Sequence, residues 1–331
     1  MTNSHAPIPA ELSIAVLLPC YNEGSAIHAV VTDFKKQLPG AVVYVYDNNS
    51  TDETRAEAKR AGAVVRTERH QGKGHVVRRM FADIDADIYV MADGDGTYDA
   101  SSAGRLINLL LTEHLDMVVG SRKETAEEAY RRGHRFGNRL LTGLVRAFFG
   151  AQFQDMLSGY RVFSRRFVKT FPANARGFEI ETELTVHAIE LRLPCCESPT
   201  EYGARAEGTV SKLNTYRDGL RILMMVLRLL FLEKPRQLFT VAGLLPMLGS
   251  IALAVPIVSE WLETGLVPRL PSTVLCTGLM LVGFLLVGFG MLLSTLTMSR
   301  REAKRLAYLA IPALPCSDEA LPEKHNATPD D

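Results

Sequence analysis

Two aspartates, Asp93 and Asp95, follow an apolar run over residues 88–91, and a glycine follows each of them. The run predicts a buried strand, and the glycines let the backbone turn tightly where a ligand comes close. In α/β proteins, ligands bind beyond the carboxyl ends of the strands. Carboxylates there are hard oxygen ligands, which Mg²⁺ or Mn²⁺ takes together with water and phosphate. The segment therefore predicts a metal site, with a turn of solvated carboxylates as the alternative.

Apolar runs alternate with amphipathic segments through the first part of the chain. We expect strands over residues 14–18, 41–46, 64–66, 88–91 and 117–119, and helices from about 25, over 51–61, up to about 84 and over 101–113. The capping-box spacing of Ser50 and Glu53 supports the second of these helices. The alternation predicts an α/β fold with a mostly parallel sheet and helices on both faces.

Polar residues follow several of these strands and are expected to meet at one edge of the sheet, because the carboxyl ends of parallel strands lie together. They are Asn22, Glu23, Asp47, Asp93, Asp95 and Arg122. Lys73 stands between two glycines ahead of a predicted helix, without the spacing of a P-loop. At a helix start it could contact a phosphate, and the alternative is a solvated lysine.

Two further charged clusters have more than one interpretation. The first contains Arg131, Arg132, Arg135 and Arg139. It fits a phosphate-binding arm, because guanidinium matches phosphate geometry, and it also fits the solvated face of a helix. The second has glutamates at positions 179, 181 and 183 before an apolar helix, where some could be partners of the helix dipole.

The last third of the chain has the pattern of a membrane anchor. Residues 213–235 carry a basic stripe and predict an amphipathic helix in the membrane interface. Uncharged apolar runs over about 238–259 and 273–298 are long enough to span a membrane, the alternative being a buried core hairpin. Positive residues flank both outer ends, which predicts a cytoplasmic catalytic domain over residues 1–212, a membrane region over 236–299 and a basic, then disordered, cytoplasmic tail over 300–331.

Composition excludes several classes of protein. Lys plus Arg and Asp plus Glu both total 37, so no charge bias indicates a nucleic-acid partner. The five cysteines are odd in number and contain no C-x-x-C pair, which indicates neither a disulfide framework nor a zinc site. The polar residues 1–11 are not expected to form a signal peptide.

Six motifs resemble, in order, those of the family 2 glycosyltransferases of GT-A fold, and among these the polyprenyl-phosphate hexosyltransferases such as dolichyl-phosphate mannose synthase. The family's P-x-Y-N-E, D-[DN]-x-S-x-D and D-x-D motifs are similar to residues 19–23, 47–52 and 93–95. The later motifs are similar to residues 120–122, 155–161 and 205–212. The resemblance covers about residues 14–212 and implies a GT-A, Rossmann-like domain.

The resemblance also implies roles for individual residues. Nucleotide-sugar binding falls to Pro19, Tyr21, Asn22, Glu23, Asp47, Asn49, Lys73, Asp93 and Gly94. Phosphate or acceptor binding falls to Arg122, Arg131, Arg135, Ser158, Arg161, Arg205, Ser211 and Lys212, with the choice among Arg131, Arg132 and Arg135 open. Asp93 and Asp95 hold Mg²⁺ or Mn²⁺ and, with Arg122, are the expected catalytic residues. Thr97 departs from the family, in which many members have Gln at that position.

The expected function is transfer of one sugar from a UDP- or GDP-hexose to polyprenyl or dolichyl phosphate at the cytoplasmic face of the inner or plasma membrane. The acceptor is already an anion, so no strong general base is required. The sugar, the lipid length and a homo-oligomeric state are left open. The alternatives are a non-catalytic nucleotide-sugar-binding scaffold and a different lipid acceptor. A processive synthase is disfavoured because Trp261, the sole tryptophan, does not lie in a Q-x-x-R-W motif.

Overall fold

The computed structural model describes residues 9, 11–122, 153, 155–203, 224, 231, 234–267 and 269–314. The chain divides into two compact units, each of which is described separately. The first, here the α/β unit, contains Met1–Ile222 and Arg305–Asp331; the second, here the hairpin, is Leu223–Lys304.

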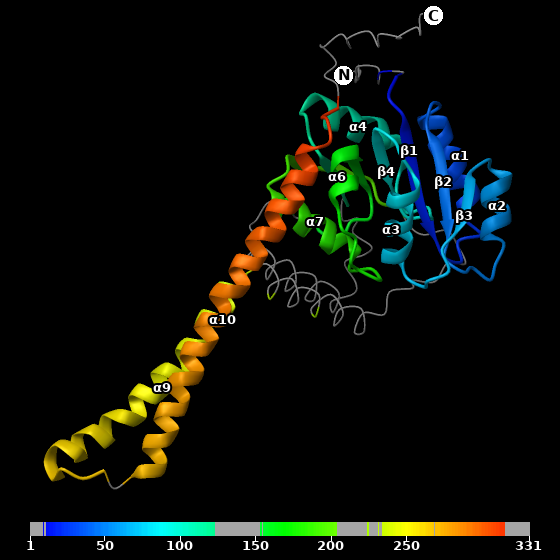
Figure 1. The fold of residues 1–331 in the computed structure, drawn as a ribbon. Coiled ribbons are helices and arrows are strands. Elements are labelled where there is room, and N and C mark those ends of the chain that lie inside the picture. Colours follow the sequence, from blue (N-terminus) through cyan, green and yellow to red (C-terminus); the bar gives the residue numbers. More distant parts are fainter. Residues whose placement is uncertain are drawn as a thin grey trace, which may run out of the picture. The chain divides into compact units, whose positions relative to one another are not determined.

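The α/β unit contains a seven-stranded sheet within the described residues (Figure 1). Its strands are β1 (Ile14–Cys20), β2 (Val42–Asp47), β3 (Val64–Thr67), β4 (Ile88–Met91), β5 (Met117–Arg122), β6 (Arg161–Ser164) and β7 (Cys195–Thr200). They lie in the order β3-β2-β1-β4-β6-β5-β7, and β6 runs antiparallel to both of its neighbours. The predicted mostly parallel sheet is therefore confirmed.

Helices cover both faces of this sheet, as expected for strands joined by crossover connections. They are α1 (Ile27–Gln37), α2 (Thr54–Arg60), α3 (Lys73–Asp83), α4 (Ala103–Thr112), α6 (Arg165–Thr170) and α7 (Ile180–Leu191), with a 3₁₀ turn η1 (Ala100–Ser102) before α4. Helix α1 packs with α2 and α4, whereas α3 packs with α6 and α7 (Figure 1). Strand β1 is buried throughout, because both of its faces are covered.

The predicted capping box at the start of α2 is wrong. The helix begins at Thr54, and the Glu53 side chain forms no cap hydrogen bond. The Ser50 hydroxyl instead accepts a hydrogen bond from the backbone N–H of Asn22 at 2.8 Å. Asp52 accepts from the Thr54 N–H at 3.1 Å and from the Gly24 N–H at 2.9 Å. The side chains expected to start the helix therefore join two loops instead.

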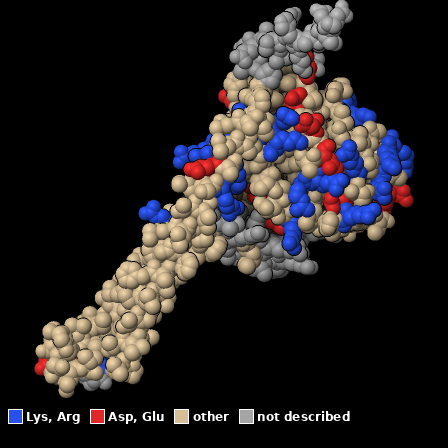
Figure 2. Space-filling view, in the orientation of Figure 1, with Lys and Arg blue, Asp and Glu red and all other residues tan. Residues whose placement is uncertain are grey.

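The hairpin consists of α9 (Pro235–Thr264) and α10 (Leu270–Leu309), whose last residues from Arg305 belong to the α/β unit. Both helices are long and apolar enough to cross a membrane. They extend beyond the predicted spans, and Pro235 is the first residue of α9. Large apolar side chains such as Leu245 and Leu262 are exposed. Figure 2 shows an almost uncharged surface along the hairpin, which supports membrane anchoring.

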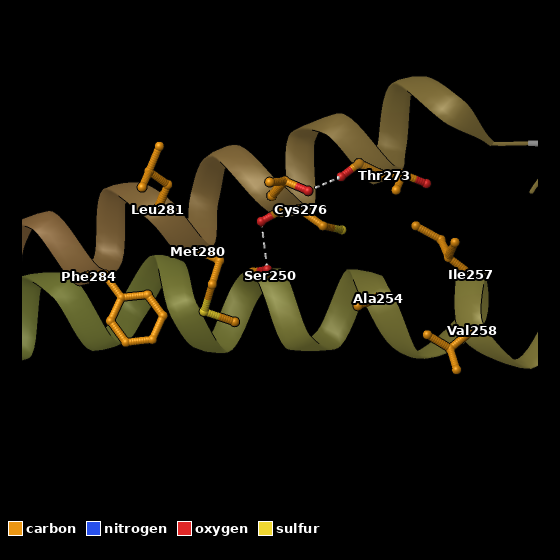
Figure 3. Close-up of a pocket in the computed structure, with 10 residues that line it drawn as sticks. Ser250, Ala254, Ile257, Val258, Thr273, Cys276, Met280, Leu281 and Phe284 are labelled. Carbon is orange, nitrogen blue, oxygen red and sulfur yellow. Dashed lines mark hydrogen bonds between the residues drawn. The ribbon is translucent and has the colours of Figure 1, made fainter.

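Small residues at seven-residue spacing form the contact between α9 and α10. The buried positions are Gly243, Ser250 and Ile257 on α9, and Cys276, Gly283, Gly290 and Thr297 on α10. A seven-residue repeat keeps one side of each helix facing its partner. The Ser250 hydroxyl donates to the backbone carbonyl of Cys276 at 2.8 Å (Figure 3). Small residues let helices approach closely where the lipid supplies no hydrophobic drive.

Candidate active site

The carboxyl ends of the parallel strands meet at one edge of the sheet, here called the rim. Cys20 at the end of β1 is paired in register with Asp47 at the end of β2. Arg122 ends β5, which runs parallel to β7, and Asp93 follows β4 by two residues. The structure thus brings the polar residues that follow four of the strands to the same edge, as the alternation of the sequence predicts.

The two aspartates after β4 have different surroundings. The Asp93 side chain is 32% exposed, so its carboxylate is accessible from the rim. Asp95 is buried and accepts hydrogen bonds from Thr97, at 2.6 Å from the hydroxyl and 3.2 Å from the N–H. Gly94 between them packs against the Cys20 thiol, and a Cβ there would overlap the sulfur. The spacing of the motif therefore presents one carboxylate and buries the other.

Lys73, the first residue of α3, forms ion pairs with the carboxylates of Asp93 and Glu181. Its side chain is 9% exposed and that of Glu181 is 4% exposed. Burial alone would lower the pKa of Lys73, but the two carboxylates outweigh it and hold the pKa above its ordinary value. Burial raises the pKa of Glu181, and the attraction of Lys73 opposes that rise. Lys73 is thus a buried cation between two acids.

The glycines on either side of Lys73 allow a close contact with a distant segment. Gly72 has φ of 131°, and a Cβ there would overlap the carbonyl oxygen of Arg176. The Gly74 N–H donates to that same carbonyl at 3.2 Å. Asn48 fixes the other side, because its side-chain oxygen accepts from the Gly72 N–H at 2.7 Å. The loop before α3 is therefore held from two directions, and Lys73 with it.

The three glutamates at the start of α7 have separate roles: Glu179 is the N-cap residue, and Glu181 and Glu183 lie in the first turn. Glu179 accepts from the N–H groups of Arg176 and Gly177, both at 3.0 Å. Glu183 accepts from the Ala175 N–H at 2.7 Å and from Asn174 at 3.0 Å. These two fix the loop over residues 174–177, and Glu181 between them is left to meet Lys73. Glu181 and Glu183 are thus placed where an acid can favour the helix dipole, and Glu181 in addition meets Lys73.

Gly159 brings the backbone against the accessible aspartate. A Cβ at this position would lie 2.8 Å from Asp93 Oδ2. The Gly159 N–H donates to the hydroxyl of Tyr98 at 2.9 Å, and Tyr98 packs against Tyr202 with ring centroids 5.3 Å apart. Asp93 therefore meets Lys73 through Oδ1, while its Oδ2 lies close to the Gly159 backbone, and the rest of the side chain is open at the rim.

The residues expected to bind the nucleotide lie on the loops after β1 and β2. Tyr21 is 38% exposed, whereas Glu23 is buried and its N–H donates to the Thr54 hydroxyl. Asn22 and Asn49 both have positive φ, and Asn22 accepts from the Thr51 N–H at 2.8 Å.

Asp47 is buried at the end of β2 and accepts from the Ser50 N–H. Asn49 donates to the Arg69 carbonyl at 2.8 Å. Pro19 lies within β1, which is buried along its length. The two loops that carry these residues are thus joined to each other, since Asn22 bonds to both Ser50 and Thr51.

Arg122 forms a bidentate ion pair with Asp155. Its Nε and one terminal nitrogen each lie 2.8 Å from a different carboxylate oxygen, and the backbone N–H of Arg122 donates to Oδ2 at 3.1 Å. Burial alone would lower the pKa of Arg122, but Asp155 raises it; correspondingly Arg122 lowers the pKa of Asp155 against the effect of burial. The guanidinium also lies 5.5 Å from the centroid of the Tyr202 ring. Arg122 is thus a fixed cation at the rim.

Arg161 and Ser158 are fully buried, and the structure does not bring them to the rim surface. Arg161 donates to the backbone carbonyls of Ser158 and Met156 at 2.9 and 2.6 Å and to the Thr185 hydroxyl at 2.9 Å. Ser158 donates to the Gly120 carbonyl at 2.5 Å. Burial lowers the pKa of Arg161. In the described conformation both side chains support the loop that carries Gly159, and a phosphate would have to displace these bonds to reach them.

The other predicted phosphate or acceptor contacts lie outside the described residues. They are Arg131, Arg135, Arg205, Ser211 and Lys212. Sequence reasoning also missed Glu181, Asp155, Gly159 and Tyr98 as members of the site. The glutamates at alternate positions were a detectable pattern, but the pairing of Glu181 with Lys73 depends on segments far apart in the chain.

The rim fits a hard divalent cation on the chemistry of its donors. Asp93 offers an accessible carboxylate, which at present pairs with the ammonium of Lys73, so a divalent cation there would compete with that ammonium. Within the described part of the chain there is no group of three or more His, Cys, Asp or Glu side chains suited to a metal ion. A cation here would therefore complete its shell with water and ligand oxygens, as Mg²⁺ commonly does.

The sheet and rim define an α/β domain of the GT-A type, and solved GT-A structures resemble it. Glucosyl-3-phosphoglycerate synthase from Mycobacterium tuberculosis, in complex with Mn²⁺, UDP and glucosyl-3-phosphoglycerate, matches with a TM-score of 0.55 and 25% identity, covering 66% of this chain and 80% of that one.

Sequence comparison leads to the same class. The model for "Glycosyl transferase family 2" matches residues 15–171. Glycosyltransferase AglJ of Haloferax volcanii is 33% identical over 305 residues, which cover 91% of this chain and all of the relative. The dolichyl-phosphate hexose transferase of the same organism is 26% identical over 223 residues, 67% of this chain and 96% of that one. The chain therefore belongs to glycosyl transferase family 2 and is a glycosyltransferase.

Proposed function

We propose that this enzyme transfers a single hexose from a UDP- or GDP-sugar to a polyprenyl or dolichyl phosphate at the cytoplasmic face of the membrane. The observation that carries the proposal is the accessible Asp93 carboxylate, held beside Lys73 and Gly159 on a domain whose chain continues into an apolar hairpin. A relative named as a dolichyl-phosphate hexose transferase supports the lipid acceptor. A neighbour solved with Mn²⁺ and UDP supports the donor class.

The residues of the rim would hold the donor by its two ends. Tyr21, Glu23 and Asp47, with Asn22 and Asn49, lie on the joined loops after β1 and β2, where the nucleoside would bind. Asp93 would hold Mg²⁺ or Mn²⁺, which when bound neutralises charge on the leaving diphosphate. The predicted metal contact of Asp95 would require this buried carboxylate to reach the ion from beside Thr97. Lys73 and Arg122 would add fixed positive charge beside the same phosphates.

The reaction needs no proton transfer. An oxygen of the acceptor phosphate forms the new bond to the anomeric carbon, and the bond from that carbon to the diphosphate oxygen breaks. The electron pair leaves with the nucleoside diphosphate, which departs as an anion. Because the attacking phosphate is already ionised at neutral pH, positioning and charge stabilisation supply the rate enhancement.

The hairpin would keep the rim at the depth of the lipid phosphate. Basic residues flank the start of α9, at Lys234 and Arg236, and lie near the end of α10, at Arg300, Arg301 and Lys304. By the positive-inside rule these ends would face the cytoplasm, and the α/β unit would lie on that side. The amphipathic helix predicted before α9 would lie in the interface, with its arginines toward the lipid head groups.

A donor screen tests the proposal. Detergent-purified enzyme is given polyprenyl phosphate, Mg²⁺ or Mn²⁺ and single radiolabelled UDP- or GDP-hexoses, and label is counted in the organic phase. We expect one donor to label the lipid, EDTA to abolish transfer and Asp93→Asn to lower it roughly 100-fold or more. Folded enzyme that labels no lipid with any donor would contradict the function and favour a nucleotide-sugar-binding scaffold or another acceptor.

A further inference from the structure

Lys73 is a buried cation whose two carboxylate partners differ in exposure. Asp93 is 32% exposed at the rim, whereas Glu181 is 4% exposed inside the protein. One partner can therefore turn to a ligand, and the other cannot leave. A salt bridge between two side chains has no second acid, whereas here Glu181 remains beside Lys73 when another cation competes for Asp93.

Charge balance decides whether Asp93 is available. If Asp93 turned to a metal and Lys73 had no other partner, an ammonium would be left buried and unpaired, which costs several kcal/mol. Glu181 prevents this, because it stays beside the ammonium whatever Asp93 binds. Without it, Asp93 would stay with Lys73 and compete poorly for the metal.

The surroundings keep Glu181 in place. Glu179 and Glu183 tie down the loop over residues 174–177, and the Arg176 carbonyl of that loop accepts from the N–H of Gly74. The start of α3 and the start of α7 are therefore joined by backbone contacts as well as by the ion pair. Glu181 and Lys73 thus face each other in a fixed frame.

We propose that Glu181 is a positioning residue that serves as the permanent counter-ion of Lys73 and so releases Asp93 to bind the divalent cation of the donor complex. Asp93 then exchanges its partner, while Lys73 remains beside it to meet the diphosphate. The inference rests on the proposed function for the identity of the metal complex.

Metal binding tests the inference without turnover. Free Mn²⁺ is measured by electron paramagnetic resonance on EDTA-treated, detergent-purified full-length protein at saturating UDP, and again at saturating GDP. We expect Glu181→Gln to weaken Mn²⁺ binding about 10-fold or more, the range found when partners of metal ligands are removed. Lys73→Met should bind Mn²⁺ at least as tightly as wild type, because the competitor for Asp93 is gone.

The double variant tests whether the loss of Mn²⁺ binding in Glu181→Gln depends on Lys73. In Glu181→Gln/Lys73→Met there is no ammonium beside Asp93, so Mn²⁺ binding should recover from the Glu181→Gln value toward that of wild type. The matched control is Glu179→Gln, which removes a negative charge two residues away but keeps a side-chain oxygen that can accept from the Arg176 and Gly177 N–H groups, and it should leave Mn²⁺ affinity unchanged. Thermal unfolding of each variant gives the folded fraction used to scale the binding data.

The outcomes separate the inference from the function. Glu181→Gln with wild-type Mn²⁺ affinity, or a double variant no better than Glu181→Gln, would overturn the inference. If wild type fails to bind Mn²⁺ both at saturating UDP and at saturating GDP, the inference falls together with the metal site. If wild type binds Mn²⁺ with one nucleotide but labels no lipid, the proposed function fails while the metal data still decide the inference.

Discussion

Gly159 at the rim lies against a charged side chain, whereas Gly243 and Gly283 in the hairpin lie against the backbone and side chains of the other helix. A Cβ at Gly159 would lie 2.8 Å from a carboxylate oxygen of Asp93, and one at Gly243 would lie 2.7 Å from the carbonyl oxygen of Gly283. At the rim, a glycine fixes the orientation of one charged group. In the hairpin, mostly small residues repeated every seven positions, glycines among them, shorten the distance between two helices. The first arrangement is specific to one atom, and the second is spread along a surface.

The largest expected effect is at the rim. Gly159→Ala should lower sugar transfer roughly 100-fold, because its Cβ would push the Asp93 carboxylate from its position. The matched control is Gly104→Ala in α4, where a Cβ meets nothing within 4 Å and alanine favours the helix. Steady-state transfer and thermal unfolding are measured for both. Equal activities in the two variants would show that Asp93 tolerates displacement.

The Arg122–Asp155 pair should contribute to the stability of the α/β unit. We expect Asp155→Asn to lower the free energy of unfolding by about 2 kcal/mol at pH 7, because charged hydrogen bonds to a half-buried arginine are lost. The folded state lowers the pKa of Asp155 below the unfolded value of about 3.9. The ionised carboxylate therefore gives its full stabilisation above the unfolded-state pKa, and this stabilisation is lost as the pH falls through the pKa of Asp155 in the folded state.

Thermal unfolding from pH 7 to pH 3 measures this dependence. The difference in unfolding temperature between wild type and Asp155→Asn should be largest near neutral pH and should become smaller toward pH 3. A difference that stays constant over the whole range would contradict the assignment of the stabilisation to the ionised carboxylate.

The hairpin should respond more weakly to a single Cβ. Gly283→Ala would overlap the Met247 side chain and lie 2.8 Å from the Gly243 carbonyl oxygen, and we expect it to destabilise the hairpin by about 1.5 kcal/mol through overpacking. Gly278→Ala on the same helix meets nothing within 4 Å and is the control. Unfolding is followed in detergent, and Mn²⁺ binding should stay intact. A loss of Mn²⁺ binding in Gly283→Ala alone would contradict the separation of the two units.

The smallest effect concerns the last turn of α10, which belongs to the α/β unit. The Tyr308 hydroxyl donates to the fully buried carboxylate of Asp116 at 2.7 Å, and Asp116 also accepts from Ser164 and Arg166. Tyr308→Phe removes one of these bonds and should lower the free energy of unfolding by about 1 kcal/mol. Denaturant unfolding measures the change. Unaltered stability would show that the other donors suffice for Asp116.

Much of this architecture was predictable, because it follows from contacts between near neighbours. The alternation of apolar runs indicated the strands, and the strand ends indicated which polar residues meet at the rim. The uncharged runs after residue 237 indicated the hairpin. Local rules failed at α2, where Ser50 bonds to Asn22 rather than capping the helix. A side chain there had two available partners, and the partner farther along the chain was preferred.

The sequence by itself determined the α/β class, the two apolar helices and the family motifs, since backbone periodicity and hydropathy depend on residues close in the chain. Only the tertiary structure decided which acid meets Lys73, which of Asp93 and Asp95 stays accessible, and that Arg161 is buried. The physical reason is that burial and charge pairing depend on which distant segments pack together. Three glutamates that look alike in the sequence thus acquire different partners once the loop over residues 174–177 lies against the start of α3.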